Sequence, residues 1–103
     1  MTDPGLVFGA LADDTRRAVF MRVAAGGQAT ASELARDLPV TRQAVAKHLS
    51  LLANAGLVES ERIGRETRFH ARSEPLSDAI DWMAGVGARW DDRLARLAKL
   101  AGS

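Results

Sequence analysis

The stretch Thr41-Arg42-Gln43-Ala44-Val45-Ala46-Lys47-His48-Leu49-Ser50-Leu51-Leu52-Ala53-Asn54-Ala55-Gly56-Leu57-Val58 decides the fold of this chain. Val45, Leu49 and Leu52 recur at i, i+4 and i+7, which is the spacing of one face of an α-helix. A threonine stands at the expected N-cap, and a glycine stands where a helix ends most easily. The pattern therefore predicts a helix over about residues 42–55.

The opposite face of this helix is polar. It carries Arg42, Gln43, Ala46, Lys47 and Ser50. Guanidinium, carboxamide and ammonium groups read base edges and bind phosphates in the major groove of DNA. The helix is therefore a candidate DNA-recognition helix. The alternative is an ordinary surface helix with a few polar residues, and the flanking segments decide between the two.

The composition indicates one globular domain, residues 1–103, because 47% of the residues are hydrophobic and 26% are charged. No apolar run approaches the ~18 residues that a transmembrane helix needs. The N-terminus also lacks the basic-then-apolar pattern of a signal peptide, so we expect a cytoplasmic protein with no membrane partner. The chain has no cysteine, which excludes disulfides, thiolate metal ligands and thiol-based redox sensing.

Positive charge is concentrated in one part of the chain. Residues 41–72 contain six Lys or Arg and three Glu, which gives +3, whereas the whole chain has a net charge of +1. The remaining residues therefore carry −2. The basic part coincides with the predicted DNA-binding part, although a solvated basic face could give the same pattern.

The segment before the recognition helix completes a helix-turn-helix over about residues 30–55. Thr30-Ala31-Ser32-Glu33 is a capping box, in which the Thr30 hydroxyl and the Glu33 carboxylate each bind a backbone N–H of the first turn. The short helix ends at Leu38-Pro39-Val40, because proline cannot continue a helix. Two helices joined by a tight turn form the motif. Two more helices are expected before it, one starting at Pro4 and one over about residues 14–25.

A β-hairpin is predicted after the recognition helix, over about residues 57–72. Residues 57–63 alternate in character, Gly64-Arg65-Glu66 is a turn, and residues 67–71 form the second strand. Arg65 at the tip is flanked by Arg62 and Arg68, and such side chains can reach phosphates or the minor groove. A basic hairpin in this place is typical of the wing of a winged helix. The alternative is a solvated hairpin that happens to carry arginines.

The last helix, expected over about residues 75–101, has an unbroken apolar seam. Its members alternate in steps of four and three: Leu76, Ile80, Met83, Gly87, Trp90, Leu94, Leu97 and Ala101. Such a helix is ~40 Å long at 1.5 Å per residue, which exceeds the width of a small domain. Gly85 and Gly87 each cost ~1 kcal/mol in a helix interior, which indicates a close backbone approach or a kink.

Part of this seam therefore needs a partner. We expect a homodimer interface formed with the first helix, through Leu6, Val7, Leu11, Met83, Trp90, Leu94 and Leu97. The alternative is that the last helix is a core helix of a monomer.

Four motifs together resemble the ArsR/SmtB family of winged-helix repressors. They are Leu11-Ala12-Asp13-Asp14-Thr15-Arg16-Arg17, Glu33-Leu34-Ala35-Arg36-Asp37-Leu38, the stretch quoted above with Ala-Val-Ala-Lys-His-Leu and Ala-Gly-Leu-Val, and Arg62-Ile63-Gly64-Arg65-Glu66-Thr67-Arg68-Phe69. The resemblance covers about residues 6–100. It implies a mainly α, winged helix-turn-helix fold of four helices, a hairpin and a fifth helix. It also implies a homodimer that binds an inverted repeat in a promoter and represses transcription.

The resemblance also implies which residues face DNA. They are Thr41, Arg42, Gln43 and Lys47 in the recognition helix, and Arg62, Arg65 and Arg68 in the wing. His48 stands where the family commonly has a histidine near the DNA, and it could bind a phosphate or only pack locally. Thr30 and Ser32 lie at a helix N-terminus, which also suits a phosphate.

A metal sensor is not expected. Family members that sense metal use cysteines in the third helix or Asp/His and His/Glu pairs in the last one, whereas here the last helix has no histidine. Zinc and nickel need nitrogen or sulfur donors to bind tightly, and His48 and His70 are solitary. The run from Trp90 to Leu97 is similar to that of metal-independent members. We therefore expect no metal and no cofactor.

The expected partners are double-stranded DNA, a second copy of the chain and an unidentified small-molecule effector. Trp82 and Trp90 could line a pocket for such an effector between the subunits, or could simply be core residues.

An enzyme is not expected, because the sequence shows no cysteine nucleophile, glycine-rich phosphate loop or Ser–His–acid grouping. The remaining alternative is a winged-helix dimerisation or protein-interaction module without specific DNA binding. Arg42, Lys47 and the wing arginines argue against it.

Overall fold

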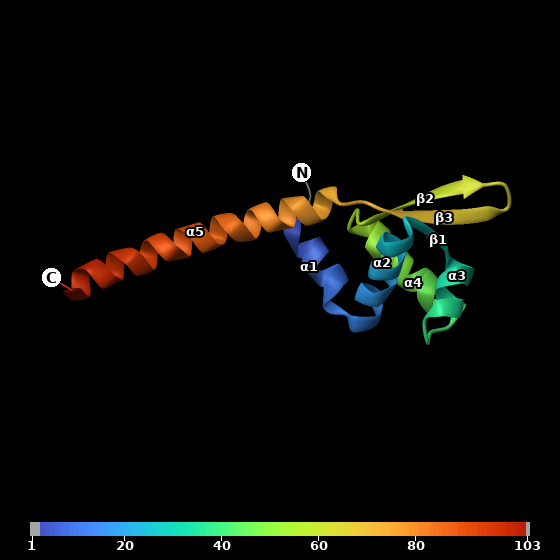
Figure 1. The fold of residues 1–103 in the computed structure, drawn as a ribbon, viewed down its shortest axis with the longest axis horizontal. Coiled ribbons are helices and arrows are strands. Elements are labelled where there is room, and N and C mark those ends of the chain that lie inside the picture. The colour runs from blue at the N-terminus through green and yellow to red at the C-terminus, as the bar shows by residue number, and fades with distance from the viewer. Residues whose placement is uncertain (1–2, 103) are drawn as a thin grey trace.

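The computed structural model describes residues 3–102. Its elements, in order, are α1 (Pro4–Ala12), α2 (Asp14–Gly26), β1 (Gln28–Thr30), α3 (Ala31–Asp37), α4 (Arg42–Asn54), β2 (Val58–Ile63), β3 (Glu66–Ala71) and α5 (Glu74–Gly102). The fold is mainly helical, with a hairpin between α4 and α5 (Figure 1). This confirms the predicted winged helix-turn-helix.

The helices of the helix-turn-helix begin at the predicted caps. The Thr41 hydroxyl accepts a hydrogen bond from the Ala44 N–H at 3.1 Å, and α4 ends before Gly56, whose φ is +77°. In α3 both bonds of the capping box form, each at 3.1 Å, between Thr30 and Glu33. Local side-chain chemistry thus fixes where both helices start.

The sheet has one strand more than the sequence indicates. β1 pairs antiparallel with β3, and the strand order is β1-β3-β2. Ala29 in β1 faces Phe69 in β3 and is buried. Three residues are too few for an alternating pattern to reveal a strand. Because α3 begins directly after β1, the pairing of β1 with β3 connects the base of the wing to the start of α3.

The core lies between the first four helices and the base of the wing. Val45, Leu49 and Leu52, the predicted inner face of α4, are all buried there. Val7 of α1 is only 1% exposed and belongs to the same core. The sequence placed Val7 in the dimer interface, but its own chain encloses the side chain, which is therefore not available to a partner.

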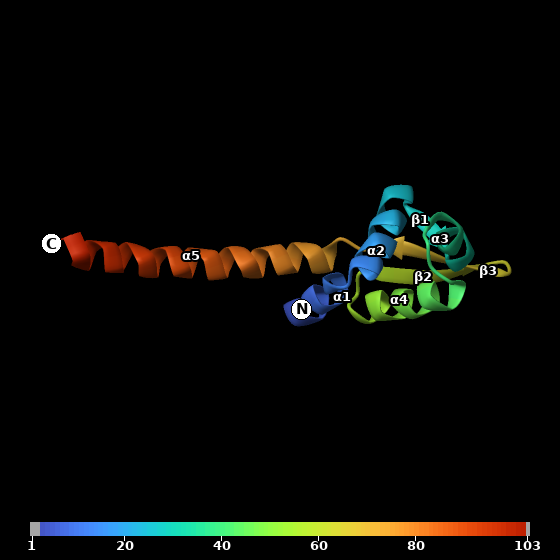
Figure 2. The ribbon, with the colours of Figure 1, turned by 90° about the horizontal axis from the view of Figure 1, so that it is seen from below.

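Helix α5 leaves the body of the protein and projects away from it (Figures 1 and 2). Pro75 and Ala79 are buried, but every residue over 80–102 is exposed. The molecule is consequently 69 Å long but only 27 Å and 19 Å in its other dimensions. The helix continues without a break through Gly85 and Gly87. No atom of the described residues lies within 4 Å of a Cβ built at either glycine, so no close approach within the protomer explains them. Within residues 3–102, no helix combines the length and apolar character needed to cross a membrane.

Candidate nucleic-acid interface

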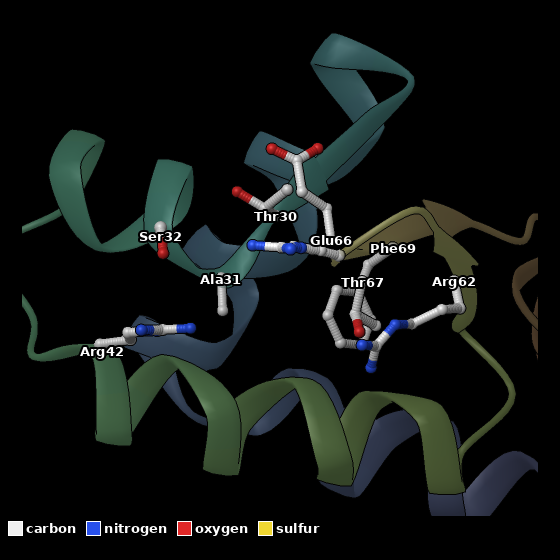
Figure 3. Close-up of a pocket in the computed structure, with 9 residues that line it drawn as sticks. Thr30, Ala31, Ser32, Arg42, Arg62, Glu66, Thr67 and Phe69 are labelled. Carbon is white, nitrogen blue, oxygen red and sulfur yellow. The ribbon is translucent and has the colours of Figure 1, made fainter.

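A cleft of about 470 Å³ lies between α3, the start of α4 and the hairpin (Figure 3). It is lined by Thr30, Ala31, Ser32, Arg42, Arg62, Arg65, Glu66, Thr67 and Phe69. Arg42 comes from α4, and Arg62 and Arg65 come from the hairpin. The fold thus brings three guanidinium groups, separated by up to 23 positions in the sequence, to one concave surface. Such a concentration of positive charge suits a phosphate backbone.

The hairpin tip presents its arginines toward this cleft. Gly64 and Arg65 form a two-residue loop between the paired residues Ile63 and Glu66, and Gly64 has φ +63°. The Nε of Arg62 donates to the Gly64 carbonyl at 3.3 Å, while its guanidinium turns toward α4 (Figure 3). The loop conformation therefore positions both side chains.

Arg68 does not line this cleft, although the sequence grouped it with the other wing arginines. Its Nη2 donates to Glu66 at 2.8 Å, and its Nη1 lies 3.7 Å from Glu33 Oε1. The side chain is only 27% exposed. The carboxylates of Glu66 and Glu33 already balance the charge of Arg68, so this side chain links the wing to α3. We therefore do not expect Arg68 to face DNA. No sequence pattern connects Glu33 with a residue so distant in the chain.

Helix α4 presents its polar face beside the cleft. Thr41, Gln43 and Lys47 are exposed, as the sequence predicts, and Arg42 extends from the same end of the helix. The Thr41 oxygen accepts the capping hydrogen bond, so its own proton remains available for a phosphate oxygen. The N-terminal half of α4 and the hairpin tip thus present polar side chains on either side of the cleft.

The comparisons with known proteins agree with this architecture. A family described as a helix-turn-helix domain matches residues 11–61. An uncharacterized HTH-type transcriptional regulator of Bacillus subtilis, YuzN, is 40% identical over 72% of this chain and 87% of its own. An ArsR-like transcriptional regulator from Rhodococcus sp. RHA1 has a TM-score of 0.88 and 42% identity, covering 95% of this chain and 92% of that one.

The chain belongs to the ArsR family of transcriptional regulators. The transcriptional repressor SdpR of Bacillus subtilis is 28% identical over 85% of this chain and 97% of its own. These relatives are regulators of transcription. As a member of the ArsR family, this protein is a DNA-binding transcriptional regulator.

His48 of this ArsR-family regulator lies at the edge of the recognition helix. It is half-buried, and its Nδ1 is buried without a hydrogen-bond partner in the structure. The imidazole lies near Asp13, the N-cap of α2. The pKa of the Asp13 carboxyl is lowered chiefly by the hydrogen bond from the Arg16 N–H, with smaller contributions from the charges of Arg16 and His48. This position supports the local-packing alternative for His48.

The second histidine also has a local partner. The Nε2 of His70 in β3 lies 3.0 Å from Glu61 Oε2 in β2, on the adjacent strand. Over residues 3–102, no group of three or more His, Asp or Glu side chains is arranged to hold a metal ion.

Proposed function

We propose that this ArsR-family regulator is a homodimeric repressor that binds an inverted-repeat operator and blocks transcription of adjacent genes. A cytoplasmic location is part of this proposal, since the protein must reach the chromosome of the cell. The observation that carries the proposal is the convergence of Arg42, Arg62 and Arg65 beside the exposed face of α4.

The DNA contacts divide between two elements. We assign base reading in the major groove to the exposed side chains of α4, chiefly Gln43 and Lys47. Arg42, Arg62 and Arg65 then bind the flanking phosphates, which fixes the register of the helix on the duplex. The Ser32 hydroxyl lines the same cleft and adds a neutral donor to the phosphate contacts, whereas the Thr30 hydroxyl is already hydrogen-bonded to Glu33.

The dimer is supported by the apolar surface of α1 and α5. Leu6, Met83, Trp90, Leu94 and Leu97 are all between 45% and 57% exposed. Large apolar side chains exposed repeatedly along one helix are typical of a protein–protein interface. A two-fold dimer presents two recognition helices in opposite orientations, and an inverted repeat has the same symmetry.

The test is fluorescence-anisotropy titration of DNA from upstream of the protein's own gene, compared with random DNA, at two salt concentrations. Selective binding with two protomers per site, which weakens steeply with salt, is the expected result. Arg96→Ala is a control variant, because it removes one positive charge from α5, far from the cleft. If the protein binds no DNA even at low salt, the repressor proposal fails and a protein-interaction module becomes the better explanation.

A further inference from the structure

The connection between the wing and α5 is very short. Only Arg72 and Ser73 lie between the end of β3 and the start of α5. Among residues 74–102, Pro75 and Ala79 alone are fully buried against the body. The direction in which α5 leaves the body (Figure 1) therefore depends on a few contacts close to its first residue.

Arg72 binds both sides of this connection. Its Nη1 is hydrogen-bonded to Glu59 in β2, and its Nε and Nη2 donate to the two carboxylate oxygens of Glu74 at 3.3 and 3.4 Å. Its backbone N–H donates to the Leu57 carbonyl at 2.8 Å, at the corner between α4 and β2. The pKa of the Glu74 carboxyl is lowered chiefly by the hydrogen bonds from Arg72. One residue thus joins the wing, the corner after α4 and the first residue of α5.

The end of the recognition helix lies against the same place. Gly56, which follows α4, has φ +77°, and a Cβ built on it would lie 3.4 Å from Cγ of Pro75. The corner after α4 therefore packs directly on the first turn of α5. A rotation of α5 at this point changes its angle to α4 as well as to the wing.

We propose that Arg72 is a positioning residue, which fixes the direction of α5 relative to α4 and the wing by holding Glu59 and Glu74 together. The inference rests on the homodimer and the operator binding proposed above. In a dimer that uses α5, this direction sets the distance between the two recognition helices. It therefore sets the spacing of the half-sites that the dimer accepts.

A small rotation at this connection is enough to change the spacing. Helix α4 has 13 residues. At 1.5 Å per residue, its DNA-facing start lies ~20 Å from the corner that packs on α5. A rotation of ~10° at that corner moves the start of α4 by ~3.5 Å, which is about the rise of one base pair.

The exposure of the three side chains predicts a larger effect on geometry than on stability. The side chains of Arg72, Glu59 and Glu74 are 44%, 63% and 65% exposed. Ion pairs between exposed groups contribute little to folding stability. We therefore expect Arg72→Gln to unfold at nearly the same denaturant concentration as the natural protein, although its α5 is held less firmly.

Spin-label distances test the direction of α5. Because the natural chain has no cysteine, Ala53→Cys in α4 and Ala95→Cys in α5 give one label on each side of the connection. Labelled protein, diluted with an excess of unlabelled protein, reports the distance within one protomer by pulsed electron paramagnetic resonance. We expect a broader or shifted distance distribution when Arg72→Gln or Glu74→Gln is added. An unchanged distribution in both variants would overturn the proposal.

Arg22→Gln is the matched control. Arg22 donates to Asp37 through Nε and Nη2, at 3.0 and 2.6 Å, and so joins α2 to α3 within the body. The variant loses an ion pair of the same kind, which also links two elements but lies away from α5. The label distances should stay as they are in the natural protein. An equal change in Arg22→Gln would show that Arg72 has no special role in directing α5.

DNA of altered spacing tests the consequence for operator recognition. The probes are the upstream DNA that the natural protein binds, versions with a base pair inserted or removed between the half-sites, and a single half-site. We expect the natural protein to prefer its own spacing by about tenfold or more. In Arg72→Gln this preference should fall to about threefold or less, with unchanged affinity for the single half-site. A preference that Arg72→Gln leaves intact would overturn the link to half-site spacing.

The two measurements separate this inference from the repressor proposal. If Arg72→Gln alters the label distances but the natural protein binds no DNA, Arg72 directs α5 and the repressor proposal fails. If two natural protomers bind the operator but Arg72→Gln alters neither the label distances nor the preferred spacing, the repressor proposal stands and this inference fails.

Discussion

Glu33 is the residue at which the helix-turn-helix and the wing meet. Its carboxylate accepts the Thr30 N–H at 3.1 Å and lies 3.7 Å from Arg68 Nη1. The pKa of this carboxyl is lowered first by the hydrogen bond from the Thr30 backbone, then by the Thr30 hydroxyl and by the charges of Arg68 and Arg36. One side chain therefore caps α3 and holds β3 in place.

This lowered pKa makes a prediction about acid stability. The stabilising effect of the Glu33 carboxylate is fully present above its usual pKa of 4.5 and is lost as the pH falls through the lower folded-state value. Glu33→Gln removes the charge but keeps an acceptor oxygen. In denaturant unfolding, we expect the variant to be less stable than the natural protein at neutral pH and the difference to shrink below pH 4.5. A difference that stays constant into acid would contradict this role of the charge.

Gln43 is the residue that we expect to discriminate between bases. Its carboxamide is exposed on α4, and a carboxamide can bind adenine with two hydrogen bonds. Gln43→Ala should cost about 1–3 kcal/mol of binding free energy on the preferred sequence and much less on random DNA. Asn54→Ala is the control, because it removes a carboxamide from the other end of the same helix. Equal losses on both DNAs would exclude base reading by Gln43.

The wing is the element whose contribution to DNA binding we expect to be independent of sequence. Arg65 lies in the two-residue loop and lines the cleft. We propose that it contacts phosphate, and phosphates are the same at every base pair. Arg65→Ala should weaken binding to all sequences alike and reduce the slope of log K against log salt by about 1. Arg96→Ala, with the same loss of charge on α5, should leave the slope unchanged. An unaltered slope for Arg65→Ala would remove Arg65 from the phosphate contacts.

Elements defined by local patterns could be predicted from the sequence, whereas those defined by distant partners could not. Helix α4 and the capping box of α3 depend on residues within a few positions of each other. Strand β1 has only three residues and exists because β3, about 40 positions later, pairs with it. The ion pairs of Arg68 have the same non-local origin.

Helix α1 shows a further limit of sequence patterns. Its nine residues, Pro4–Ala12, are all apolar or small, so no polar face marks which side meets the core. Periodicity therefore could not separate Val7, which is buried in the protomer, from Leu6, which is 45% exposed. Only the packing of α1 against the other helices distinguishes the two.

At the scale of the whole molecule, the body of the protomer is too small to bury its longest helix, α5, along its full length. Helix α5 has 29 residues, ~43 Å at 1.5 Å per residue, and only its first turns pack on the body. α1 lies beside those first turns (Figure 2), where the rings of Phe8 and Trp82 are 5.8 Å apart. The remaining length carries the apolar seam into solvent. If the proposed homodimer covers this seam, we expect its stability to be linked to DNA binding.

Leu97→Glu tests the link between dimerisation and DNA binding. Leu97 is 57% exposed and lies far from the body, so we expect the protomer of this variant to fold normally. A charge in the seam should yield a monomer by sedimentation. Affinity for DNA with two half-sites should then fall about 100-fold or more, because the second protomer is no longer joined to the one already bound. Affinity for DNA with one half-site should stay the same.

Ala95→Glu adds the same charge to the outer face of α5 and should remain dimeric, with full affinity for both DNAs. A monomeric Leu97→Glu that still binds the double site as tightly as the natural protein would show that DNA, and not α5, brings the two protomers together.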